Sequence, residues 1–189
     1  MPKYPISRLA GKLFHVHLDM PVPNVFYTSM DSDLLIKRKF TFRVGDQKLI
    51  LIKKPVESAR HVIMKALLWA LYLPEYPDLQ VETGIDHKYK PDLVHMESEA
   101  PVFWGEAGSI GTSKLRRILK RFPNTHFAFA IWGADLNQFE TRIRHQARKA
   151  KRTGPVDAIR FSPDADRLFI DDRGNINIRH NDLEWRRIV

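Results

Sequence analysis

The sequence contains no cysteine among its 189 residues. This excludes disulfide bonds and thiolate metal sites, and the lack of disulfides is consistent with a cytoplasmic protein. The N-terminal region has no uninterrupted apolar run, and no apolar run elsewhere is long enough to span a bilayer. We therefore expect neither a secretory signal nor a membrane partner. Repeats, low-complexity tracts and linker-like segments are also lacking, which predicts one compact domain with a sizeable core.

The charge of the chain is unevenly distributed. The formal net charge is +9, and the segment 114–152 accounts for all of it, with eleven Lys or Arg residues and two acids. The remaining residues are balanced, with twenty basic and twenty acidic side chains. A basic segment of this kind attracts polyanions, which favours nucleic acid as the partner. General solubility and an acidic protein partner are the alternatives.

A predicted hairpin directly precedes this basic segment. Two short β-rich runs flank the turn-like residues 97–101, as in a β-hairpin. If Glu99 is the centre of the turn, Met96 faces Val102 in a regular antiparallel pair. The alternative is a one-residue bulge or slip in the pairing, which would shift side chains to the other face of the sheet.

The regular register also places two acids, Asp92 and Glu106, directly opposite each other. Opposed residues lie on one face of a sheet with their Cβ atoms about 5 Å apart. Two carboxylates at that distance repel unless a positive charge lies between them. Because hard divalent cations prefer carboxylate oxygens, the register predicts a metal site. A bulge would separate the acids and remove this prediction.

A basic helix is predicted after the hairpin. Apolar residues recur at helical spacing from Leu115 onward, with Thr112 or Ser113 as the cap and Pro123 after the end. Lys114 lies in the first turn beside the apolar stripe, where it could reach a phosphate held by the two acids. An ordinary solvated face is the alternative for its basic residues Lys114, Arg116, Arg117, Lys120 and Arg121.

A second helix, over residues 57–73, is expected to be buried. From Val62 onward nearly every residue except Lys65 is apolar, and a helix that is apolar on all sides is buried. Glu57 and His61 lie one turn apart at its polar start. Glu57 there is either a functional carboxylate or a simple partner of the helix dipole, which is worth about 0.3–1 kcal/mol.

The order of these patterns predicts the α/β class. We expect a hairpin over 35–53, the buried helix, three strands, a helix, a strand, a helix, a strand and a final hairpin over 168–178. This order corresponds to a mixed β-sheet flanked by helices. Residues 35–189 then form a single domain. Residues 1–34 are interpreted as an arm that packs on the domain or on a second subunit, as in a homodimer.

In the predicted hairpin and the basic helix after it, the chain resembles the PD-(D/E)xK nuclease superfamily. Pro91-Asp92 matches the first half of its motif and Glu106 the acid of the second half. The resemblance implies a restriction-endonuclease-like core with the element order αβββαβ. The lysine of the family motif would stand at Gly108, so this chain departs from the pattern. Some members carry the lysine on the following helix, where Lys114 is the candidate.

Within the superfamily the chain is most similar to the YaeQ-like group, over residues 37–187. The resemblance rests on a Pro-x-Glu helix start with a late tryptophan, a Pro-Asp-Leu strand, a Glu-x-Gly and a basic helix. Here these are Pro55, Glu57 and Trp69, then Pro91-Asp92-Leu93, then Glu106-Ala107-Gly108, then Lys114, Arg116 and Arg117.

The resemblance implies a phosphodiesterase that depends on Mg²⁺ or Mn²⁺. Asp92, Glu106 and the carbonyl of Ala107 would hold the cation, Glu57 would complete the site, and Lys114 would be catalytic. The predicted nucleic-acid contacts are Arg116, Arg117, Lys120 and Arg121. A module that binds nucleic acid or a transcription-associated partner without cutting is the competing hypothesis, and a structural subunit is the third.

Overall fold

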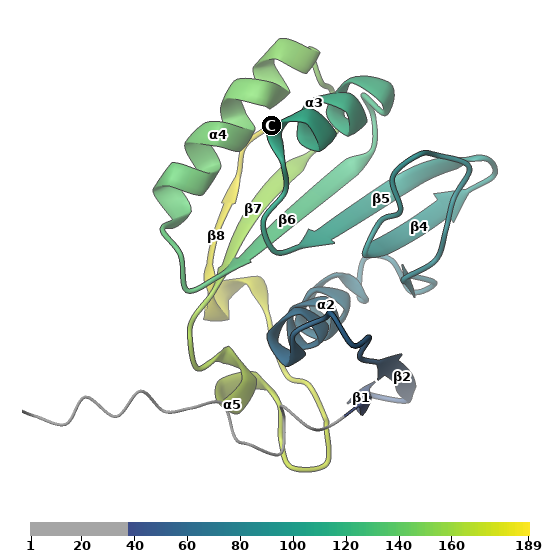
Figure 1. The fold of residues 1–189 in the computed structure, drawn as a ribbon, viewed down its shortest axis with the longest axis vertical. Coiled ribbons are helices and arrows are strands. Elements are labelled where there is room, and N and C mark those ends of the chain that lie inside the picture. The colour runs from purple at the N-terminus through teal and green to yellow at the C-terminus, as the bar shows by residue number, and fades with distance from the viewer. Residues whose placement is uncertain (1–37) are drawn as a thin grey trace, which may run out of the picture.

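The computed structural model describes residues 38–189 (Figure 1). The arm predicted for residues 1–34, and the homodimer through it, therefore lie outside the described residues. The elements are β1 (Lys39–Val44), β2 (Gln47–Ile52), α2 (Ala59–Tyr72), β3 (Gln80–Val81), β4 (Leu93–Glu97), β5 (Ala100–Ala107), α3 (Thr112–Arg121), β6 (His126–Trp132), α4 (Leu136–Ala150), β7 (Val156–Phe161), α5 (Ala165–Phe169), a 3-10 turn (His180–Asp182) and β8 (Glu184–Arg187).

A six-stranded mixed sheet forms the centre of the molecule. Its strands are ordered β3-β4-β5-β6-β7-β8. The central strands β5, β6 and β7 are parallel, whereas β3, β4 and β8 run antiparallel to their neighbours. The predicted α/β class with a mixed sheet is confirmed, and α2, β3, β4, β5, α3 and β6 follow in the predicted order.

Helices cover both faces of the sheet, with α2 on one side and α3 and α4 on the other (Figure 1). Side chains alternate between the faces along a strand. In β5, Phe103 packs in the core under α2, while Trp104 packs in the core under α3 and α4. Strand β6 is a nearly continuous apolar run because both of its faces are covered.

The two-stranded hairpin β1–β2 explains why α2 is apolar all round. Phe40, Phe42 and Leu51 of this hairpin belong to the same buried cluster as α2 and the sheet residues beneath it. The helix is thus enclosed between the sheet and the hairpin (Figure 1). The predicted N-terminal hairpin is confirmed, with Lys39 paired to Ile52 and Val44 to Gln47.

The predicted C-terminal hairpin forms only at its turn. The N–H of Asp171 donates to the carbonyl of Asn175, and Ile170 bridges Ile176 in the antiparallel sense. The first predicted strand is wrong, because most of it belongs to α5. The second side of the turn also bonds to β1, where the N–H of Ile176 donates to the carbonyl of Arg43. The last strand of the chain is instead β8, which pairs with β7.

Among residues 38–189, no helix combines the length and the apolar character needed to cross a membrane.

Candidate active site

The hairpin that carries the predicted acids has a tighter turn than expected. Strands β4 and β5 are joined by residues 98–99, and Met96 pairs with Pro101 rather than with Val102. A one-residue irregularity then follows, because His95 pairs with Phe103. The two-residue turn and the bulge offset each other, so the register beyond them is the one that a turn centred on residue 99 would give.

Beyond the bulge the two acids become neighbours. Val94 pairs with Trp104, as predicted. Asp92 directly precedes β4, and its Oδ2 accepts a hydrogen bond of 2.8 Å from the backbone N–H of Ala107. Ala107 is the residue after Glu106, so this hydrogen bond brings Asp92 close to Glu106. The negative charge of Asp92 is one of the causes that raise the pKa of Glu106.

Glu106 is a buried carboxylate with a partner on each oxygen. Its Oε1 accepts a 2.7 Å hydrogen bond from Nε1 of Trp104, and its Oε2 lies 2.6 Å from Nζ of Lys114. Burial raises the pKa of Glu106, Lys114 lowers it and Asp92 raises it, and the pKa is raised overall. The structure thus brings Lys114 from α3 onto the acid, as the sequence suggested.

Asp92 faces the opposite helix, α2. Nε2 of His61 lies 3.5 Å from Oδ1 of Asp92 and 3.7 Å from Oε1 of Glu57. Burial opposes the ionisation of Asp92, but the hydrogen bonds from His61 and from the N–H of Ala107 outweigh it, so its pKa is lowered. Sequence reasoning did not place His61 in the site, although its position one turn after Glu57 was the available signal.

Glu57 is held in a separate ion pair with Lys65. The side chain of Lys65 is only 1% exposed, and its ammonium contacts both Glu57 and Glu82. Burial alone would lower the pKa of Lys65, but the two carboxylates raise it overall. Sequence reasoning missed Lys65, whose signal was a single charged residue within an apolar helix.

The start of α3 differs from the prediction. The N-cap is Gly111 rather than Thr112 or Ser113, and no side chain caps this end. The predicted basic face does form: its members are exposed, namely Arg116, Arg117, Lys120 and Arg121. On the same helix, Arg117 donates to the hydroxyl of Tyr89 at 3.3 Å, and Nζ of Lys114 lies 5.9 Å from the centre of the Tyr89 ring.

A second buried polar cluster lies at the other end of α2, and sequence reasoning missed it. Asp157 is fully buried and accepts hydrogen bonds from Tyr72 at 2.7 Å and from His126 at 2.8 Å. Arg187 donates to both of its oxygens, at 2.9 and 3.0 Å. Burial opposes the ionisation of Asp157, but these donors hold its pKa well below the usual range.

Comparisons with known proteins bear on the fold alone. No protein-family model and no curated protein matches the chain. Among solved structures, the YaeQ protein from Xanthomonas axonopodis pv. citri is similar, with 18% sequence identity and a TM-score of 0.50 over 69% of this chain and 76% of that chain. The fold of this chain is YaeQ-like. The YaeQ protein from Pseudomonas syringae is also similar, with 16% identity and a TM-score of 0.47 over 65% of this chain and 70% of that chain.

Each residue of the candidate site is carried by a different secondary-structure element or its edge. Asp92 precedes β4, Glu106 lies near the end of β5, His61 lies in the first turn of α2, and Lys114 lies in the first turn of α3. The site therefore forms where the starts of two helices, on opposite faces of the sheet, meet one end of the β4–β5 hairpin.

Gly108 stands two residues after Glu106, directly after the end of β5. Its backbone has φ +95°, a conformation that favours glycine over residues with a side chain. A Cβ built there would lie 3.7 Å from Nδ1 of His61 and from Cε of Met64. The ammonium group that contacts Glu106 comes from Lys114.

Proposed function

We propose that this protein is a metal-dependent phosphodiesterase that acts on nucleic acid, with Asp92, Glu106 and Lys114 as its catalytic residues. The observation that carries the proposal is the contact of Lys114 with Glu106 at the end of the β4–β5 hairpin, where Asp92 accepts the backbone N–H of Ala107, the residue after Glu106. The resemblance to the PD-(D/E)xK superfamily supports it, because Asp92 and Glu106 match the acids of that motif.

The protein could supply only a few of the oxygen ligands that Mg²⁺ or Mn²⁺ needs. No group of three His, Asp or Glu side chains within residues 38–189 could hold a metal ion. Mg²⁺, however, is often held by one or two carboxylates, with waters and substrate phosphates in the other positions. Asp92, Glu106 and the carbonyl of Ala107 fit that pattern. A ligand role for Glu57 stays a prediction, since its carboxylate contacts Lys65.

When bound, the cation would lower the pKa of a coordinated water and offset negative charge on the phosphate. The side chains of the chain supply the rest. Lys114 would exchange its contact with Glu106 for the attacking water or a phosphate oxygen, where its charge stabilises the transition state. His61 would keep Asp92 oriented and ionised.

The exposed side of α3 would bind the substrate backbone. Arg117 lies one turn after Lys114, and Tyr89 contacts both. Arginine binds phosphate oxygens with two parallel N–H groups. The proposed phosphate contacts are therefore Arg116, Arg117, Lys120 and Arg121, which continue from the catalytic lysine along the helix.

A binding module is the second candidate. It is favoured by the fact that both oxygens of Glu106 already have protein partners, Lys114 and Trp104. In that case the basic face of α3 would hold nucleic acid, or a transcription-associated partner, without cutting. Such binding would weaken steeply with salt because counterions are released.

Cleavage of labelled single- and double-stranded DNA and RNA in Mg²⁺ or Mn²⁺ tests the proposal. We expect cleavage by the wild type and none by Glu106→Gln. The matched control is Glu97→Gln, which makes the same change at an exposed position of the same hairpin. A salt-dependent mobility shift without metal-dependent cleavage would favour the binding module, and cleavage that survives Glu106→Gln would rule out the proposed site.

A further inference from the structure

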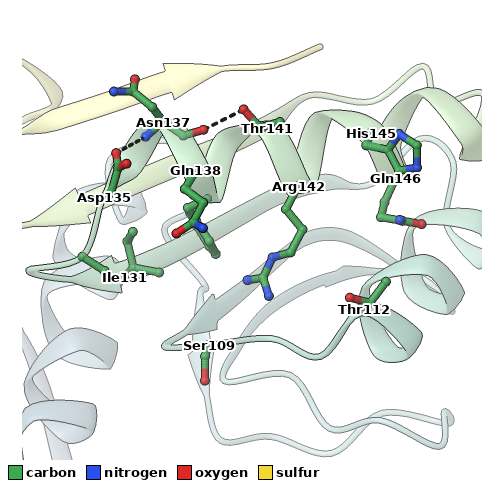
Figure 2. Close-up of a pocket in the computed structure, with 12 residues that line it drawn as sticks. Ser109, Thr112, Ile131, Asp135, Asn137, Gln138, Thr141, Arg142, His145 and Gln146 are labelled. Carbon is green, nitrogen blue, oxygen red and sulfur yellow. Dashed lines mark hydrogen bonds between the residues drawn. The ribbon is translucent and has the colours of Figure 1, made fainter.

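A groove between the start of α3 and the length of α4 has no assigned role. It encloses about 950 Å³, within the usual size range of ligand pockets. Its apolar floor includes Ile131 of β6 and Phe139 of α4, both nearly buried. Figure 2 shows Gln138, Arg142 and Gln146 projecting from α4 toward the segment that carries Ser109 and Thr112.

The start of α3 leaves donors for an anion at one side of the groove. The first backbone N–H groups of a helix have no intrahelical acceptor, and here no side chain caps them. Thr112, in the first turn of this ten-residue helix, lines the groove. The uncapped N–H groups and the positive end of the helix dipole favour a negatively charged ligand.

Gln146 is the second and independent indication of a ligand. Gln146 is only 8% exposed, yet it lines the groove. Within residues 38–189 the side-chain amide of Gln146 has no hydrogen-bond partner, and its atoms are not among the fully buried ones. The amide is therefore open to the groove, because the rest of the residue is buried. A ligand in the groove could hydrogen bond to this amide in place of water.

Arg142 supplies a positive charge to the same groove. Its guanidinium lies 5.5 Å from the centre of the Phe139 ring, and it forms no ion pair with any acid in the described part of the chain. Asp135 lies at the far end of the groove in Figure 2, where its Oδ1 accepts the N–H of Asn137 at 2.8 Å. The groove thus has a basic end near α3 and an acidic end at the start of α4.

We propose that this groove binds one nucleotide unit, with its phosphate at the basic end. Arg142 and the N–H groups of the first turn of α3 hold the phosphate. Gln146 hydrogen bonds to the phosphate or sugar. The base lies over Ile131, and Gln138 and Asp135 are hydrogen-bond partners for its edge. The ligand is a free nucleotide or one unit of a strand, and only the strand form rests on the proposed function.

Titration of the full chain in EDTA tests the groove without cleavage. The probes are adenosine monophosphate, adenosine, inorganic phosphate and a short oligoadenylate. We expect the nucleotide to bind at least about tenfold more tightly than adenosine, because hydrogen bonds to a charged group are the stronger ones. Arg142→Ala should weaken nucleotide binding by about tenfold or more, and Gln146→Leu should weaken it too.

Two matched controls separate the groove from general surface charge. Arg148→Ala removes the same charge from an exposed position of α4 outside the groove, so it should leave binding unchanged. Thr112→Pro removes a first-turn N–H at a position where proline is tolerated, and Gly111 before it is already extended. This variant should bind more weakly than Thr112→Ala, which keeps that N–H.

Three results would overturn the assignment of the groove as a nucleotide site. They are equal losses of binding in Arg142→Ala and Arg148→Ala, equal affinity for adenosine and adenosine monophosphate, and no binding of either the nucleotide or oligoadenylate. Binding of oligoadenylate alone, with the same dependence on Arg142, assigns the groove to a strand. Absence of cleavage with intact nucleotide binding would refute the proposed hydrolase and leave this groove assigned.

Discussion

Nζ of Lys114 lies 2.6 Å from Oε2 of Glu106, which joins the first turn of α3 to the end of β5. The contact is partly shielded from water, since the Glu106 side chain is 8% exposed and that of Lys114 is 26% exposed. It connects the cation of the basic helix to the acid of the hairpin, so both the proposed chemistry and the local stability depend on it.

Lys114→Met should destabilise the protein at neutral pH by about 1–3 kcal/mol, because a buried carboxylate loses its charged partner. The folded-state pKa of Glu106 is already raised, so the folded protein retains that proton to higher pH than the unfolded chain does. Stability from this group therefore falls as pH rises through the unfolded and then the folded pKa, and the variant should lose more over this window. Urea unfolding from pH 4 to 7 measures this, with Lys149→Met as the exposed control; identical pH dependence of variant and wild type would contradict it.

Lys65→Met should have a larger effect, about 3–5 kcal/mol at pH 7, because it leaves Glu57 and Glu82 without their shared cation. Addition of Glu57→Gln and Glu82→Gln to the same variant should recover much of the loss, since the unpaired charges are then gone. Chemical denaturation of the single and triple variants measures both effects. Lys120→Met, at an exposed position, is the control, and a triple variant no more stable than Lys65→Met would refute the pairing.

Asp157→Asn should cost about 3–5 kcal/mol, because Arg187, His126 and Tyr72 lose a buried charged acceptor. The pKa of Asp157 is depressed in the folded state. Its contribution to stability is therefore complete above the unfolded-state pKa and is lost as pH falls toward the folded pKa.

Acid unfolding monitored by circular dichroism checks this expectation for Asp157. The Asp157→Asn variant should lose less stability than the wild type between pH 4 and pH 2. Asp172→Asn, at an exposed turn position, should behave like the wild type. An Asp157→Asn variant with wild-type stability at pH 7 would show that the cluster does not stabilise the fold.

Gly108→Lys, which places a lysine two residues after Glu106, should not improve activity. The position has φ +95°, where a side chain costs about 1–2 kcal/mol, so we expect lower thermal stability from both Gly108→Lys and Gly108→Ala. Gly84→Ala is the control, because no atom lies within 4 Å of a Cβ placed there and its φ is not positive. Increased metal-dependent cleavage by Gly108→Lys would contradict this account.

The sequence predicted the architecture wherever a pattern was long. The apolar helix α2, the strand β6 and the hairpin β4–β5 were found because their periodicity reflects burial on both faces or on one. The register that brings Asp92 and Glu106 to the same end of the hairpin was predicted as well, although through a turn of the wrong length. The two side chains contact helices on opposite faces of the sheet, α2 and α3, rather than sharing one face as predicted. The two-residue turn shifts the strand register and the bulge shifts it back. No local sequence pattern indicates either of these two shifts.

Other features depend on contacts between distant residues. Nothing near 168–178 in the sequence indicates that it bonds to β1. A full two-stranded hairpin was therefore predicted where a short helix precedes a turn with one antiparallel bridge. His61 and Asp157 acquire their partners only after the sheet and α2 have packed together. The usable sequence signals for these polar contacts were the lone charge of Lys65 in an apolar helix and the position of His61 one turn after Glu57.

Polar contacts fix both ends of α2, through Lys65 and His61 near its start and through Tyr72 at its end. The helix therefore cannot slide along the sheet or turn about its axis without breaking one of these sets. Helix α3 has an uncapped start, and Lys114 forms its ion pair with Glu106. Induced fit around a ligand would thus consist of α3 shifting against a stationary α2, and ligand-dependent changes in amide exchange should be concentrated in residues 108–121.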